Sequence, residues 1–111
     1  METGVVVAVT TVDSERVANQ MARILVEKEM AACVQVAGPV QSHYRWEGKA
    51  CQDQEWQVWM KCVQSKVDQI GRWLDSNHPY DAPQFVVLPV INGSRSYLNW
   101  VLAASGGSSD V

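Results

Sequence analysis

Hydrophobic positions follow first a strand pattern and then a helix pattern at the start of the chain. Residues 5–9 form a short β-branched run with almost no polar side chain, which is typical of a strand covered on both faces. Apolar residues then recur every three or four positions, which predicts an amphipathic helix over residues 14–29 with Asp13 as its N-cap. We therefore expect a central strand followed by a helix.

A long antiparallel hairpin is predicted next. Residues 32–46 are expected to form one strand that bends or bulges at Gly38-Pro39, because proline cannot donate a hydrogen bond within a sheet. The alternation of apolar and polar residues continues through residues 55–62, and the best match of apolar faces leaves a loop at residues 47–49. This register opposes Val40 to Trp56, His43 to Asp53, and Arg45 to Cys51.

Three further elements complete the pattern. Apolar residues at helical spacing predict a second helix over residues 66–76, and Ser65 with Asp68 resembles a capping box at its start. The apolar run at residues 85–90 predicts a fourth strand. Ser94 is placed to cap a short last helix.

The order of these elements predicts an α+β fold. Strand, helix, strand, strand, helix and strand pack most simply as a ferredoxin-like βαββαβ sandwich, in which two helices cover one face of an antiparallel sheet. The short C-terminal helix follows. We expect a single domain over residues 1–104 and a flexible tail over residues 105–111, because 111 residues suffice for one core only.

Composition and charge narrow the range of functions. Nine lysines and arginines against twelve acidic residues give a net charge of −3, which disfavours nucleic acid as a partner. The chain contains no apolar run of the ~20 residues that a membrane span requires and no leader-like N-terminal segment, so we expect a cytoplasmic protein. Three cysteines without a CxxC pair are expected to be reduced structural thiols: Cys33, Cys51 and Cys62.

Trp59 interrupts an otherwise polar strand face. Either the two helices cover this face and Trp59 belongs to the core, or the face is an interface between subunits. The long hairpin also leaves unpaired backbone groups at its edge, which natural proteins usually cover or pair. Oligomerisation is therefore plausible from the sequence alone.

Catalysis is not indicated by any local motif. Nucleophilic catalysis requires a nucleophile, a base and an orienting group within hydrogen-bonding reach. No Ser-His-Asp or Cys-His set is evident at local spacing. The sequence therefore favours a binding or scaffold protein over an enzyme.

Several segments together resemble one known family, the CutA divalent-cation tolerance proteins. They are LVEKEMAACV at 25–34, YRWEGK at 44–49, HPYDAP at 78–83, LPV at 88–90 and YLNW at 97–100. The similarity runs from about residue 5 to residue 100. It implies a homotrimer in which long strands of neighbouring subunits pair at their edges, and a role in tolerance of, or response to, divalent metal ions.

The resemblance also points to copper. Some bacterial members are thought to bind copper through a cysteine, a histidine and a glutamate, at positions that hold Val9, Asn77 and Gln84 here, and none of these three is a good copper ligand. The remaining candidate ligands for a divalent ion such as copper are His78 and Asp81. Alternatively, His78 caps the preceding helix, where a hydrogen-bond donor near the last carbonyls is favourable.

A ligand cleft between subunits is the second candidate site. The aromatic residues Tyr44, Trp46 and Tyr80 lie in connecting segments of the resemblance, close in sequence to the candidate metal ligands. By analogy of fold alone, such a cleft suggests a PII-like trimeric small-molecule sensor or a structural scaffold as the alternative to a metal-tolerance protein. The alternative is that these residues specify a turn and a trimer contact.

Overall fold

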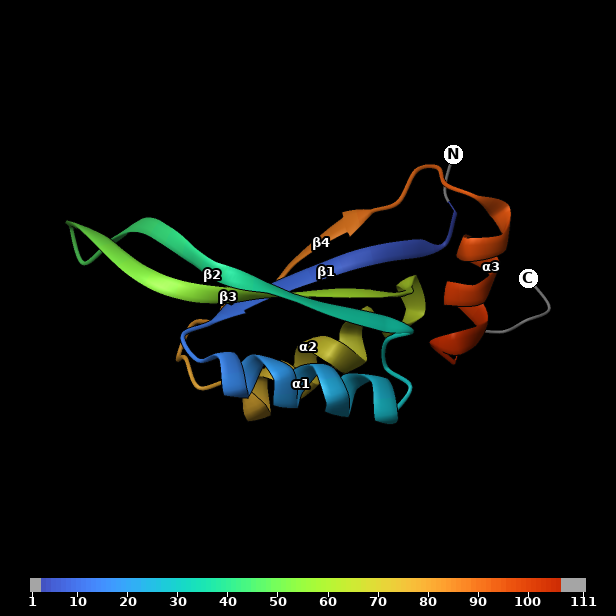
Figure 1. Ribbon diagram of the computed structural model, residues 1–111, viewed down its shortest axis with the longest axis horizontal. Helices are drawn as coiled ribbons and strands as arrows, with labels where there is room; N and C mark the ends of the chain where they lie inside the picture. Colours follow the sequence, from blue (N-terminus) through green and yellow to red (C-terminus); the bar gives the residue numbers. More distant parts are fainter. Residues whose placement is uncertain (1–2, 107–111) are drawn as a thin grey trace.

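The computed structural model describes residues 3–106 and confirms the predicted α+β architecture (Figure 1). The sheet is antiparallel, with strand order β2-β3-β1-β4, so that β1 is central as predicted. Helices α1 and α2 cover one face, and α3 lies at the end of the sheet away from the hairpin. The elements are β1 (Val5–Val12), α1 (Glu15–Glu27), β2 (Cys33–Trp46), β3 (Lys49–Val63), the 3₁₀ turn η1 (Gln64–Lys66), α2 (Val67–Asn77), β4 (Val86–Pro89) and α3 (Arg95–Ala104).

The core fills the space between the sheet and its two covering helices. Leu25 of α1, Leu74 of α2 and Met60 of β3 are among the fully buried side chains that meet there. Cys62 belongs to the same cluster, and burial raises the pKa of its thiol to about 11, which fits the predicted structural role. All three cysteines are free thiols.

A smaller cluster attaches α3 to the end of the sheet. Val101 packs there with Val5 and Ala32, all three buried. Ser105, which the sequence assigned to a flexible tail, is also fully buried; its hydroxyl accepts a hydrogen bond from Val63 N at 2.9 Å and donates one to Val101 O at 2.6 Å. The packed body therefore extends past residue 104, and the predicted tail from residue 107 onward lies outside the described residues.

The helix starts differ from the sequence-based expectation in detail. Ser14, not Asp13, is the N-cap of α1, and its hydroxyl accepts a hydrogen bond from Val17 N at 3.2 Å. The capping box predicted at Ser65 is replaced by η1, and the residue at the N-cap of α2 makes no side-chain capping bond. Ser94 does occupy the N-cap position of α3, again without a side-chain capping bond. No helix within residues 3–106 is long and apolar enough to span a membrane.

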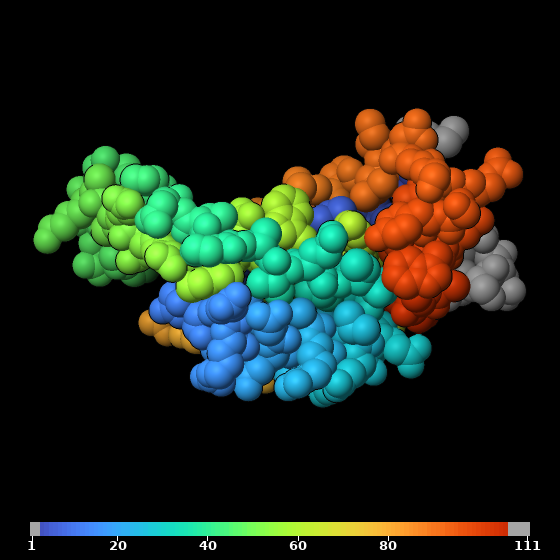
Figure 2. Space-filling view, viewed as in Figure 1, coloured from blue at the N-terminus to red at the C-terminus, as the bar shows by residue number. Residues whose placement is uncertain are grey.

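The hairpin of β2 and β3 extends beyond the helices as a free projection, which we call the arm (residues 40–55; Figure 2). The predicted register of the arm is wrong by one residue, and a bulge between Ala37 and Val40, where β2 carries one extra residue, shifts the register again at the base of the arm. The turn consequently contains only two residues, Glu47 and Gly48, both with positive φ. In the observed register Val40 opposes Glu55, His43 opposes Gln52, and Arg45 opposes Ala50.

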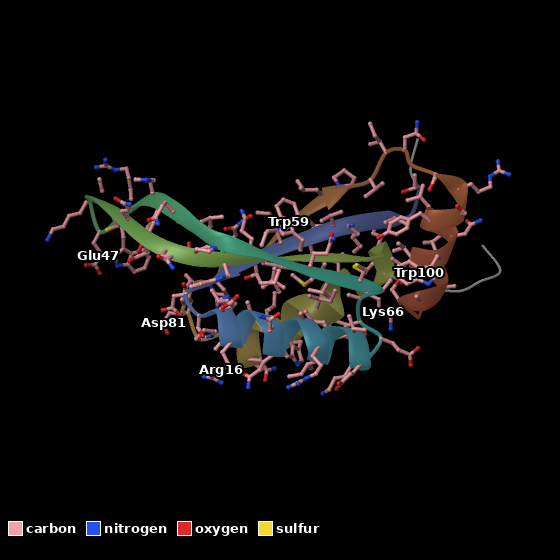
Figure 3. All side chains as sticks on the ribbon, viewed as in Figure 1. Arg16, Glu47, Trp59, Lys66, Asp81 and Trp100 are labelled. Atoms are coloured by element: carbon pink, nitrogen blue, oxygen red, sulfur yellow. The ribbon has the colours of Figure 1, made fainter. Side chains whose placement is uncertain are left out.

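The sheet face opposite α1 and α2 carries apolar side chains and is covered by α3 only at one end. We call it the open face (Figure 1). Two rows of paired residues cross it: Val86, Val9, Trp59 and Gln35; and Leu88, Val7, Lys61 and Cys33. Trp59 is half-buried and points away from α1 and α2 (Figure 3), so the interpretation that these helices cover it is wrong.

Candidate functional site

A groove of about 780 Å³ lies at the base of the arm. Its walls come from the end of β1, from the arm, and from the segment between α2 and β4, which passes below the arm near Asp81 (Figure 3). The lining residues are Thr11, Asp13, Ser42, His43, Tyr44, Trp46, Asp53, Gln54, Glu55, Tyr80, Asp81, Ala82 and Gln84.

The structure brings together the residues that the sequence proposed for a cleft. Tyr44 and Trp46 reach the groove from β2, while Tyr80 and Asp81 reach it from the segment after α2. The bulge at Gly38-Pro39 sets which face of the arm carries Tyr44, because one extra residue exchanges the two faces of a strand. The use of this groove as a binding site stays a prediction.

Glu55 is the buried acidic residue of the groove, with 8% of its surface exposed. Its Oε2 accepts a hydrogen bond from the Tyr80 hydroxyl at 2.7 Å. Burial, and then the hydrogen bond to Glu55, raise the pKa of the Tyr80 phenol above its ordinary value. Tyr80 is therefore a protonated donor at neutral pH, and it ties the segment after α2 to the arm.

A second tyrosine and carboxylate pair lies farther along the arm. The Tyr44 hydroxyl donates a hydrogen bond to the Asp53 carboxylate. This hydrogen bond is the largest of the effects that raise the pKa of Tyr44 to about 12. The two residues share an arm face, because Ser42 opposes Asp53 and Tyr44 follows two positions later. Asp53 therefore does not oppose His43 as predicted. It opposes Ser42 and accepts the hydrogen bond from Tyr44.

His78 joins the segment after α2 to the end of β1. Its Nδ1 accepts a hydrogen bond from Tyr80 N at 3.0 Å, and its Nε2 lies 2.9 Å from Thr11 O. Because a carbonyl only accepts, these partners assign the neutral tautomer with the proton on Nε2. Burial lowers the pKa of His78 and outweighs the opposing effects of Thr11 O and nearby carboxylates.

The alternative role of His78 as a helix cap is fulfilled by its backbone instead. The backbone N–H of His78 donates to Leu74 O at 2.8 Å at the end of α2, while the ring points to β1. The ring therefore positions the groove wall rather than capping the helix.

The metal assignment to His78 and Asp81 stays a prediction. A metal ion at either ring nitrogen of His78 would have to displace one of the two hydrogen bonds described above. Within residues 3–106, no three His, Cys, Asp or Glu side chains are grouped so as to hold a metal ion. Of the residues at the positions implied for copper, Gln84 lines the groove, Val9 is buried in the sheet, and Asn77 donates to Trp73 O at 2.8 Å.

The groove is strongly acidic. Four carboxylates line it, those of Asp13, Asp53, Glu55 and Asp81, and the lining residues identified in the described part of the chain include neither lysine nor arginine. A concave surface with one sign of charge concentrates counter-ions. The groove is therefore suited to a cationic ligand.

Sequence reasoning did not single out Glu55 as a site residue. The strand pattern placed it among solvated polar residues, and its burial depends on Tyr80, 25 positions later in the chain. The contact between the Thr11 carbonyl and His78 was not foreseen either, because it spans 67 positions. Local pattern carries no signal for either contact.

His78 predicts a specific pH dependence of stability. Its pKa is lower in the folded protein than the ~6.5 expected in an unfolded chain, so its stabilising effect is complete above pH 6.5 and declines below that value. We expect the free energy of unfolding, measured by urea titration, to fall between about pH 7 and pH 5, and to fall less in His78→Gln. The exposed His43→Gln serves as the control. An unchanged pH profile in His78→Gln would contradict the assigned neutral state.

The fold and the groove together define a class: small ferredoxin-like α+β proteins with a projecting β-hairpin arm and an acidic groove at its base. The family model described as "CutA1 divalent ion tolerance protein" matches residues 6–104. The chain belongs to this family.

Curated relatives and solved structures agree with this assignment. The chain is 37% identical over 100 residues to the divalent-cation tolerance protein CutA of Thermus thermophilus, covering 90% of this chain and 97% of that protein. It is also 37% identical to the human protein CutA, covering 93% of this chain but only 58% of the human protein, and it spans about half the length of the CutA proteins of Arabidopsis thaliana and mouse.

The solved CutA structure from Synechococcus elongatus superimposes with a TM-score of 0.88 at 37% identity, covering 95% of this chain and 94% of that one. A second structure of that protein, described as complexed with a Bis-Tris molecule, gives a TM-score of 0.84 at 36% identity, covering 94% of this chain and 97% of that one.

Proposed function

We propose that the protein acts in divalent-cation tolerance as a cytoplasmic CutA homotrimer that binds cations in the groove, as a binding protein and not as an enzyme. The observation that carries the proposal is the acidic lining of the groove, in which the buried Glu55 lies beside Tyr80 and three further carboxylates. Membership of the divalent ion tolerance family supplies the cellular role.

The trimer is supported by surfaces that a single subunit leaves uncovered. Leu88 on β4 is 48% exposed, and Val86 beside it is also exposed. Trp100 of α3 is exposed and lies beside Tyr97, with a distance of 5.6 Å between ring centroids. Strands β2 and β4 are the edges of the sheet, and their outer backbone groups have no strand partner within residues 3–106. Pairing of edge strands between subunits would give these backbone groups partners, and contact between subunits over the open face would bury the exposed apolar side chains.

Calorimetric titration of the reduced, chelator-treated protein with Cu(II) tests the metal-binding part of the proposal. We expect saturable binding that is at least about 10-fold weaker in Asp81→Asn, because a hydrogen bond to a charged group contributes about 1.5–3 kcal/mol. Asp75→Asn is the matched control, since Asp75 is exposed on α2 and lies outside the groove lining. The absence of saturable binding would refute direct copper binding.

The same titration on His78→Ala tests whether the imidazole is a ligand. Loss of binding in a correctly folded variant would show that copper displaces one of the two hydrogen bonds of the ring. Retained binding would place the ion on the carboxylates instead.

A second candidate function, a PII-like small-molecule sensor or scaffold, is favoured by the dimensions of the groove. About 780 Å³ lies within the range of ~300–1,000 Å³ that is usual for small-molecule sites. A relative is moreover described in complex with Bis-Tris. Both functions would use the same groove and differ in the ligand that occupies it, a divalent metal ion or a small molecule.

A further inference from the structure

The Glu55 carboxylate lacks a cationic partner. Glu55 is more than nine-tenths buried, and within residues 3–106 the only hydrogen bond to its side chain comes from the Tyr80 hydroxyl, which reaches Oε2. Buried charges in proteins are normally paired, because removing an unpaired carboxylate from water is costly. The lining residues supply no lysine or arginine in the described part of the chain, so the groove offers a carboxylate without a cationic partner to a ligand.

Aromatic rings line the same groove. Tyr44 and Trp46 reach it from the arm, and Tyr80 reaches it from the opposite wall. The Tyr80 ring is held in place by its hydroxyl bond to Glu55 and by an edge contact with His78, whose ring centroid is 4.9 Å away. Aromatic faces attract cations through their quadrupole, and this attraction strengthens when the cation is partly desolvated.

An organic cation needs fewer converging ligands in the groove than a bare metal ion does. Metal sites require several converging ligands, and the described residues contain no such group. Two of the four carboxylates, those of Asp53 and Glu55, are already hydrogen-bonded to phenols and so are held at fixed positions along the arm. The volume of about 780 Å³ accommodates a molecule of several heavy atoms.

We propose that the groove binds a small organic ammonium ion, with the Glu55 carboxylate as its counter-charge and the aromatic rings as its walls. The hydroxyl groups of Thr11 and Ser42 and the amide groups of Gln54 and Gln84 also line the groove, so hydroxylated ammonium ions are favoured. The inference rests on the proposed cation-binding function and specifies the class of cation.

Choline and its uncharged isostere 3,3-dimethylbutan-1-ol form a matched pair of probes, because they differ essentially in charge. We expect calorimetric titration of the full chain, in phosphate buffer free of amines, to show saturable choline binding and at least about 10-fold weaker binding of the neutral alcohol. Equal binding of the two probes, or no binding of choline, would overturn the inference.

Two variants test the assigned counter-charge. Glu55→Gln keeps the shape of the side chain and should weaken choline binding at least about 10-fold, whereas Glu47→Gln at the exposed tip of the arm should leave it unchanged (Figure 3). Should Glu55→Gln fail to fold, as judged by circular dichroism, Asp53→Asn at an exposed position is used in its place. This variant should likewise weaken choline binding. Unchanged choline binding in the folded variant would overturn the inference.

Parallel titration with Cu(II) separates this inference from the function on which it rests. Copper binding without choline binding would refute the ammonium site and leave the cation-binding function intact. Choline binding without copper binding would support the ammonium site and refute direct metal binding. Failure of both cations to bind would refute both proposals.

Discussion

Substitution of Leu88 by glutamate is expected to dissociate the proposed trimer into monomers. Leu88 is 48% exposed on the edge strand β4, where it pairs with Val7 in a row of the open face. If this face is buried between subunits, three carboxylates would be moved into an apolar interface, at a cost of several kcal/mol each. Sedimentation velocity should show a fall to one third of the wild-type mass at micromolar concentration.

The control for this prediction is Val26→Glu. Val26 is 43% exposed, but it lies on α1, on the other side of the sheet. The same polar substitution there should leave the mass unchanged. A trimer that survives Leu88→Glu would show that subunits do not associate through the β4 side of the open face.

Replacement of Leu25 by alanine is expected to have the largest effect on the stability of the subunit. Leu25 is fully buried between α1 and the sheet, and its removal leaves a cavity that the packed core cannot fill. We expect the free energy of unfolding to fall by about 2–5 kcal/mol. Urea denaturation followed by circular dichroism, at one fixed protein concentration, measures this change.

The neighbouring residue provides the control for the core prediction. Val26→Ala alters an exposed side chain of the same helix and should change the free energy of unfolding by roughly 0.5 kcal/mol or less. Similar losses in the two variants would contradict the placement of Leu25 in the core. The fixed concentration matters because association of subunits in the proposed trimer would contribute to the measured stability.

The fold was largely predictable because its core elements have strong local patterns. The β-branched run of β1 and the apolar stripe of α1 each indicate which faces are buried. The register of β2 with β3 was not predictable to the residue, although the bend at Gly38-Pro39 was. One bulged residue exchanges the two faces of the strand that carries it, and alternation of apolar residues does not show on which strand that residue lies.

The candidate site was predictable only in part. The resemblance pointed to Tyr44, Trp46 and Tyr80, and these residues do line one groove. Glu55 escaped notice because its burial is created by a segment that is distant in the sequence and folds against the arm. The role of His78 was also inaccessible, since the hydrogen bonds of its ring depend on the position of the β1 backbone.

The arm is what connects the two proposals. Its base forms one wall of the acidic groove, and its outer strand β2 is an unpaired edge of the sheet within the described residues. Pairing of this edge with a neighbouring subunit would hold Tyr44 and Asp53 in place and so preorganise the groove. Association of subunits is therefore expected to strengthen cation binding.

The mass of the wild-type protein in solution tests the central claim, a CutA homotrimer, most directly. Sedimentation equilibrium at micromolar concentration should give a single species of about 37 kDa, three times the 12.3 kDa of the chain. A single species of 12.3 kDa would contradict the claim, because the open face and the edge of β2 would then remain exposed to solvent.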